Sequence, residues 1–109
     1  MSTQHKELAA GRWFRLTLAE QLGNIGSEVH RAASAHNKND SEFRPAFYRA
    51  LELIGLTLQD PRHRGRLKEI ARLRETLCDA AAGGAMYHTT LEDIDRYLMH
   101  FALAARLRR

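Results

Sequence analysis

Hydrophobic side chains recur along the chain at alternating intervals of three and four residues. The first such stripe follows Thr17 and consists of Leu18, Leu22, Ile25, Val29, Ala32 and His36. This period is typical of an amphipathic α-helix with one buried face. Thr17 and Glu20 match the Ser/Thr-x-x-Glu pattern of a capping box, in which each side chain bonds the other residue's backbone amide. The pattern therefore predicts a helix from about residue 17 to residue 36.

Three further helices are predicted after a polar break at residues 37–41. The second covers about residues 41–58 and has a broad apolar face. The third begins near Asp60-Pro61, where a capping residue precedes a first-turn proline, and ends at Gly83-Gly84. The fourth has its apolar positions between Leu91 and Ala105.

Four amphipathic helices with short connections indicate an all-α fold, an antiparallel four-helix bundle. The segment before Thr17 contains Trp13 and Phe14, and we expect it to form a short helix or strap that closes one end of the bundle. No stretch alternates at period two, so no strand is predicted. A chain of 109 residues is long enough for one compact domain and too short for two, so a single domain is expected over residues 1–109.

The composition is that of a globular chain, with 44% hydrophobic and 28% charged residues. No apolar run approaches the roughly 20 residues that a membrane-spanning helix needs, and no signal peptide is recognisable. The single cysteine, Cys78, excludes an internal disulfide framework. We therefore expect a cytoplasmic protein with no membrane partner.

The positive charge is concentrated in one segment. The formal net charge is +4, yet residues 61–74 alone contain six basic and one acidic side chain. Arginine binds phosphate through paired hydrogen bonds, so this segment predicts contact with an RNA or DNA backbone. The expected nucleic-acid-binding residues are Arg62, Arg64, Arg66, Lys68 and Arg72, extended by Arg106, Arg108 and Arg109 if the helix ends meet. Two alternatives are docking to an acidic protein and a solvated face that pairs with the acidic residues of 75–103.

Small residues form a second face on the first predicted helix, at Ala19, Gly23 and Gly26. Glycine inside a helix costs about 1 kcal/mol relative to alanine, so two glycines this close together suggest that another backbone approaches there. One interpretation is a self-association surface, which would make the protein a homo-oligomer. The other is tight packing against a neighbouring helix of the same bundle.

The six histidines do not form a recognisable metal motif. Neither Glu-x-x-His nor His-x-x-x-His occurs, so no metal and no cofactor are predicted. Arg31 precedes His36 by five residues, which resembles the active-site motif of HEPN-domain ribonucleases. That resemblance would make Arg31 and His36 the catalytic candidates, although Ala32 replaces the polar residue that usually follows the arginine. A non-enzymatic binding protein is the favoured interpretation, and a ribonuclease is an alternative.

Two wider resemblances agree with a helical bundle. The segments Trp13–Arg31 and Phe101–Arg106 resemble a group of small bacterial helical-bundle proteins with no assigned activity, which implies a bacterial source. Asn24, Ile25 and Glu28, with the length and basic character, resemble the four-helix-bundle family of 23S rRNA intervening-sequence proteins. That family includes the accessory variability protein of diversity-generating retroelements, but its Asn-Ile-Ala-Glu-Gly run is not reproduced here. The second resemblance implies a basic oligomeric barrel that binds nucleic acid and a partner enzyme.

Overall fold

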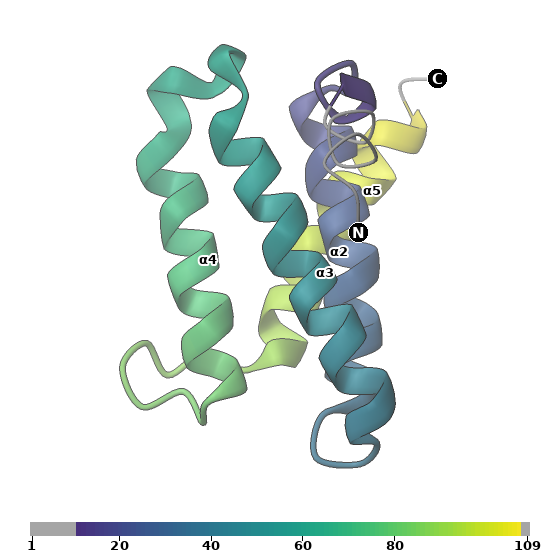
Figure 1. Cartoon of the computed structure of the whole chain (residues 1–109), viewed down its shortest axis with the longest axis vertical. Coiled ribbons are helices and arrows are strands. Elements are labelled where there is room, and N and C mark those ends of the chain that lie inside the picture. The colour runs from purple at the N-terminus through teal and green to yellow at the C-terminus, as the bar shows by residue number, and fades with distance from the viewer. Residues whose placement is uncertain (1–10, 108–109) are drawn as a thin grey trace.

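Helices account for all the regular secondary structure in the computed structural model, which describes residues 11–107. Residues 11–13 are helical, and they are followed by α2 (Leu18–Ala35), α3 (Asp40–Gln59), the short 3₁₀-helix η1 (Pro61–Arg66), α4 (Leu67–Ala81) and α5 (Leu91–Leu107). In Figure 1 the chain reverses direction along its long axis from α2 to α3, from α3 to α4 and from α4 to α5. The all-α prediction is confirmed for this range.

Hydrogen bonds at the helix starts agree with the capping signals in the sequence. The Glu20 amide donates to Thr17 Oγ1 at 3.1 Å, and the Thr17 amide donates to Glu20 Oε1 at 2.9 Å. Thr90 and Asp93 form the same reciprocal pair at the start of α5. Each pair satisfies two backbone donors that have no partner inside the helix.

The third predicted helix is divided into two elements. Residues 61–66 form η1, within which His63 has a non-helical backbone (φ −105°, ψ 23°), and α4 begins only at Leu67. A 3₁₀-helix has three residues per turn, so the basic side chains of this segment do not share one α-helical face. The irregular start agrees with the glycine at position 65.

The core lies between α2 and the helices around it. Helix α2 packs closely against both α3 and α5, whereas α4 makes fewer close backbone approaches to α3 and α5. Ile25, Ile54, Leu77 and Leu98 come from the four different α-helices and are fully buried. No helix within residues 11–107 has both the length and the apolar character needed to cross a membrane.

The glycines of α2 lie at its crossing with α5. A Cβ atom added at Gly23 would stand 3.0 Å from the Ala102 Cα, and one added at Gly26 would stand 2.9 Å from the Leu98 Cβ. Real Cβ atoms essentially never approach other atoms more closely than 3.0 Å, so the helices meet at Gly26 at a distance that only glycine allows, and the contact at Gly23 is at that limit. Packing within the chain therefore explains Gly23 and Gly26. Self-association through the face of Ala19, Gly23 and Gly26 stays a prediction.

Candidate nucleic-acid interface

A buried carboxylate holds the corner between α3 and η1. Asp60 follows the last residue of α3 and is only 2% exposed. Its carboxylate accepts hydrogen bonds from the Arg62 amide at 3.0 Å, from Arg62 Nη2 at 2.6 Å and from Gln21 Nε2 at 3.1 Å. A buried charge is tolerated when it is paired and hydrogen-bonded in this way. Asp60 thus links the start of η1 to helix α2.

The hydrogen bonds continue from Asp60 into the segment before α2. Gln21 Nε2 also donates to the Trp13 carbonyl oxygen at 2.9 Å, and Trp13 Nε1 donates to Thr57 Oγ1 at 2.9 Å. His63 Nε2 lies 2.8 Å from Gln21 Oε1 and acts as the donor, because an amide oxygen only accepts. No buried side-chain polar atom in residues 11–107 lacks a hydrogen-bond partner. We call Trp13, Gln21, Thr57, Asp60 and His63 the polar cluster.

Arg62 determines the protonation of Asp60. Its guanidinium donates to both carboxylate oxygens and holds the pKa of Asp60 well below its usual range. Burial of the carboxylate acts in the opposite direction, whereas the Arg62 amide, Gln21 and His63 lower the pKa further. Asp60 is therefore ionised in the folded protein at every pH at which an ordinary aspartate is.

The depressed pKa predicts that acid destabilises the fold through Asp60. In the unfolded chain Asp60 should titrate near 3.9, above its folded pKa, so its contribution to stability is complete above that value. The contribution is lost as pH falls below about 4 towards the folded pKa. We expect the free energy of unfolding, measured by urea titration at a series of pH values, to fall less steeply with acid in Asp60→Asn than in the wild type. Parallel pH profiles for the two proteins would exclude this role of Asp60.

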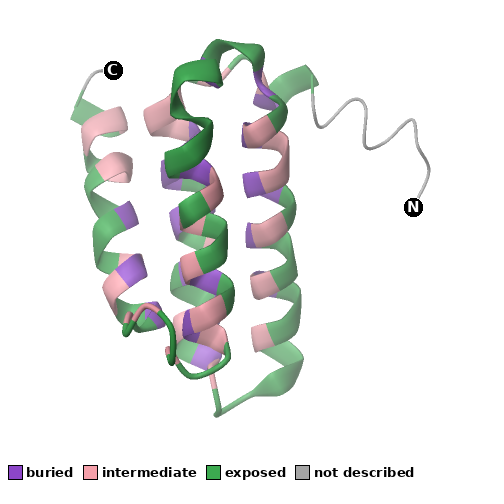
Figure 2. Cartoon of the chain, turned by 90° about the vertical axis from the view of Figure 1, so that its left-hand side faces the viewer, coloured by how far each residue is buried: buried purple, intermediate pink, exposed green. Residues whose placement is uncertain are grey.

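Exposed cations cover the corner that the polar cluster holds. Arg64 and Lys68 are exposed and form no ion pair or hydrogen bond with any residue in the described range 11–107. Arg66 lies 3.7 Å from Glu69, a loose pair with both side chains more than half exposed. We call Arg64, Arg66 and Lys68 the η1–α4 basic surface. In Figure 2 this corner, at the top of the molecule, is drawn almost entirely as exposed.

Two of the other predicted residues have partners within the chain. Arg62 is bound to Asp60 and also donates to the Leu16 carbonyl oxygen at 2.6 Å, so it positions η1. The Arg72 guanidinium lies over the Tyr87 ring, 5.1 Å from its centroid, and 3.9 Å from Glu75. Both arginines are therefore partly engaged, in contrast to Arg64 and Lys68.

The basic residues near the end of the chain do not join this surface. Arg106 lines a groove between α2 and α5, and Figure 1 shows the end of α5 on the opposite side of the molecule from η1 and α4. Arg108 and Arg109 lie outside the described residues. Arg64, Arg66 and Lys68 thus lie within one five-residue segment at the junction of η1 and α4, and Arg106 lies elsewhere.

The two catalytic candidates have different surroundings. Arg31 is exposed and pairs with Glu28 at 3.1 Å. His36 follows the last residue of α2, and its Nε2 lies 3.2 Å from the Ala81 carbonyl oxygen while its ring packs against Phe43 at 4.9 Å between centroids. The structure does not place the two side chains at one site.

The sequence pattern predicts Asp60 only as a helix cap, and it does not predict the polar cluster. One signal was available, because Gln21 precedes Ile25 by four residues and so falls on the buried stripe of α2. A polar side chain at such a position needs a buried partner. The identity of the partners could not be read from spacing, since Thr57, Asp60 and His63 are about forty residues away along the chain.

Within residues 11–107, no group of three or more histidine, cysteine, aspartate or glutamate residues is arranged to hold a metal ion. Comparison of the chain with models of protein families, with curated proteins and with solved structures found no match. A proposal for function therefore depends on the geometry of the chain itself.

Proposed function

We propose that this protein is a self-associating, antiparallel four-helix bundle that binds the phosphate backbone of RNA or DNA through the η1–α4 basic surface. The observation that carries the proposal is the exposure of Arg64 and Lys68 without an internal partner, next to a loosely paired Arg66. Cations in this state lose little when they exchange water for a phosphate group.

The rigidity of the corner supports the same function. The polar cluster joins η1 to α2, α3 and the segment before α2 through hydrogen bonds of 2.8 to 3.1 Å. A binding surface that is already ordered loses less conformational entropy when its ligand arrives. Asp60 and Arg62 thus serve binding indirectly, by holding the backbone that presents the three cations.

Binding of this kind reads charge and carries little sequence information. Phosphate contacts position a protein on nucleic acid, whereas base contacts provide specificity. The basic residues of η1 and the first turn of α4 are not interleaved with aromatic side chains on which bases would stack. We therefore expect similar affinity for single strands of different sequence and a strong dependence on salt.

A double substitution tests this surface. For three contacted phosphates on a single strand, raising the salt concentration fourfold should weaken binding about 20-fold, and for one contact only about threefold. We expect the binding of the wild type to weaken about 20-fold. The variant Arg64→Gln/Lys68→Gln keeps only Arg66, and we expect its binding to weaken about threefold. The measurement is fluorescence anisotropy of short labelled RNA and DNA strands at two salt concentrations.

Lys38→Gln/Arg44→Gln is the matched control. It removes one exposed lysine from the connection of α2 to α3 and one exposed arginine from the start of α3, and Figure 1 shows this connection at the opposite end of the molecule from η1. Its salt dependence should equal that of the wild type. Equal loss in both double variants would mean that net charge matters and the η1–α4 basic surface does not. Absence of binding at low salt would reject the proposal and favour docking to an acidic protein.

A further inference from the structure

The outward side of α5 carries an exposed apolar stripe. Met99, Leu103 and Leu107 follow one another at intervals of four residues and are 48%, 48% and 85% exposed. Residues at this spacing lie on one side of a helix. Single exposed apolar residues are ordinary on a protein surface, but a row of them on one helix indicates an interaction surface.

An acidic and a basic side chain lie at equal distances on either side of Met99. Glu92 precedes Met99 by seven residues and Arg106 follows it by seven, so each is about 10 Å away along the same side of the helix. Both are exposed, and neither forms an ion pair or hydrogen bond with a residue in the described part of the chain. The other charged residues of α5 are paired, Asp93 with Arg96 and Asp95 with His30.

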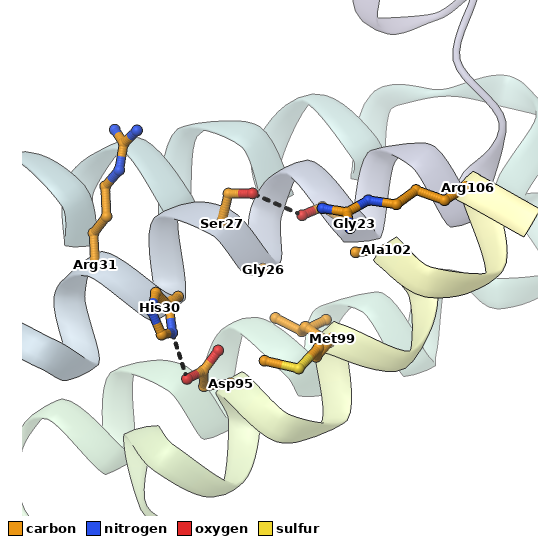
Figure 3. A pocket seen from close by; sticks show the side chains of 10 residues that line it. Gly23, Gly26, Ser27, His30, Arg31, Asp95, Met99, Ala102 and Arg106 are labelled. Carbon is orange, nitrogen blue, oxygen red and sulfur yellow. Dashed lines mark hydrogen bonds and ion pairs between the residues drawn. The ribbon is translucent and has the colours of Figure 1, made fainter.

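A groove runs beside this stripe, between α5 and α2. It has a volume of about 330 Å³, and the small residues Gly23, Gly26 and Ala102 contribute to its lining. Figure 3 shows Met99 and Arg106 on its α5 side, with Arg106 extending along the groove. Met99 belongs both to the exposed stripe and to the lining of the groove, so the two form one continuous surface.

We propose that a second copy of this chain covers this face, with its α5 antiparallel to the first α5 and a two-fold axis near Met99. In that register Glu92 of each copy meets Arg106 of the other and Met99 meets Met99, while Leu103 and Leu107 of each copy lie over the first half of the other α5. A parallel pairing at the same register would place like charges together, Glu92 against Glu92 and Arg106 against Arg106. The inference rests on the self-association in the proposed function and is independent of phosphate binding.

The size of the surface suits such an interface. Helix α5 has 17 residues, which corresponds to a length of about 25 Å. A stable dimer usually buries about 800 Å² on each partner, so the α2 rim of the groove must take part beside α5. Ser27 and His30 provide that rim. An isologous contact of this kind closes on itself and gives a dimer.

One substitution with a matched control tests the surface by analytical ultracentrifugation. The wild type is expected to sediment as a dimer, and Leu103→Glu to raise the dimer dissociation constant by at least about tenfold. Leu67→Glu is the control, because Leu67 on α4 is 40% exposed and lies off α5. It should remain as dimeric as the wild type. Circular dichroism establishes that both variants keep their helical content.

A charge exchange tests the register. Glu92→Arg and Arg106→Glu should each weaken the dimer, and the double variant should restore it, because only an antiparallel pair brings these two positions together. A monomeric wild type at concentrations up to roughly 100 μM would reject self-association itself. A dimer that Leu103→Glu leaves intact, or one that the double exchange does not restore, would reject this interface while leaving self-association in place.

Discussion

Asp60→Ala is expected to lower the free energy of unfolding by about 1–3 kcal/mol, the usual cost of leaving a buried hydrogen-bond donor without its acceptor. The substitution leaves the Arg62 guanidinium and the Gln21 side-chain amide without their shared acceptor. It also removes the acceptor of the Arg62 backbone amide at the start of η1. The effect is expected to arise mainly at Gln21, which is fully buried, because the Arg62 side chain is 45% exposed and water can replace its lost acceptor.

Equilibrium denaturation in urea measures this effect, and Asp40→Ala is its control. Asp40 also pairs with an arginine, Arg44, but both side chains of this pair are exposed to solvent, Asp40 at 71% and Arg44 at 68%. An exposed pair contributes about 0–1 kcal/mol, so the control should unfold nearly as the wild type does. If both variants lost a similar free energy of unfolding, the burial of Asp60 would not contribute to stability.

Gly26→Leu is expected to destabilise the fold by about 3 kcal/mol, at the upper end of the usual cost of overpacking. Even a Cβ atom at this position would stand 2.9 Å from the Leu98 Cβ, and the leucine side chain adds three further carbon atoms. Leu98 is itself fully buried, so it has no space into which it can withdraw. The two helices must therefore separate, which opens the core that Ile25 and Leu98 share.

Gly55→Leu separates this steric effect from the general effect of replacing a helical glycine. Gly55 lies in α3, and a Cβ added there meets no atom within 4 Å. The higher helix propensity of leucine should then make the change neutral or stabilising by up to about 1 kcal/mol. Thermal or urea denaturation of both variants gives the comparison. If Gly26→Leu is as stable as Gly55→Leu, the close crossing of α2 and α5 is not required for the fold.

The helices were predictable because local patterns determine them. The apolar stripe from Leu18 to Ala32 and the Thr17–Glu20 capping box locate α2 to within a residue at each end. The division of the third helix was not predicted, because Asp60-Pro61 is compatible with either an α-helix or a 3₁₀-helix at its start. That choice depends on hydrogen bonds between distant segments, which periodicity does not reveal.

The candidate site was predictable in part, for the same reason. The density of basic residues in 61–74 is a property of the sequence, so Arg64, Arg66 and Lys68 could be named from it. Whether a basic side chain is paired within the chain depends on residues that are close in space but distant in sequence. Arg62 differs from Arg64 because it bonds the buried Asp60 carboxylate and the Leu16 carbonyl oxygen, and the sequence pattern does not distinguish the two arginines.

The position of α5 in the chain has a consequence for how the core is completed. Helix α2 packs against α3, which follows it directly, and against α5, which follows more than fifty residues later. During synthesis α2 and α3 are available to pair first, while the side of α2 that carries Gly23 and Gly26 is still uncovered. The backbone groups and small side chains of that side meet their partners only after residues 98–102 have been made. The core is therefore completed late in synthesis. Until then the uncovered side of α2 is open to association with other chains.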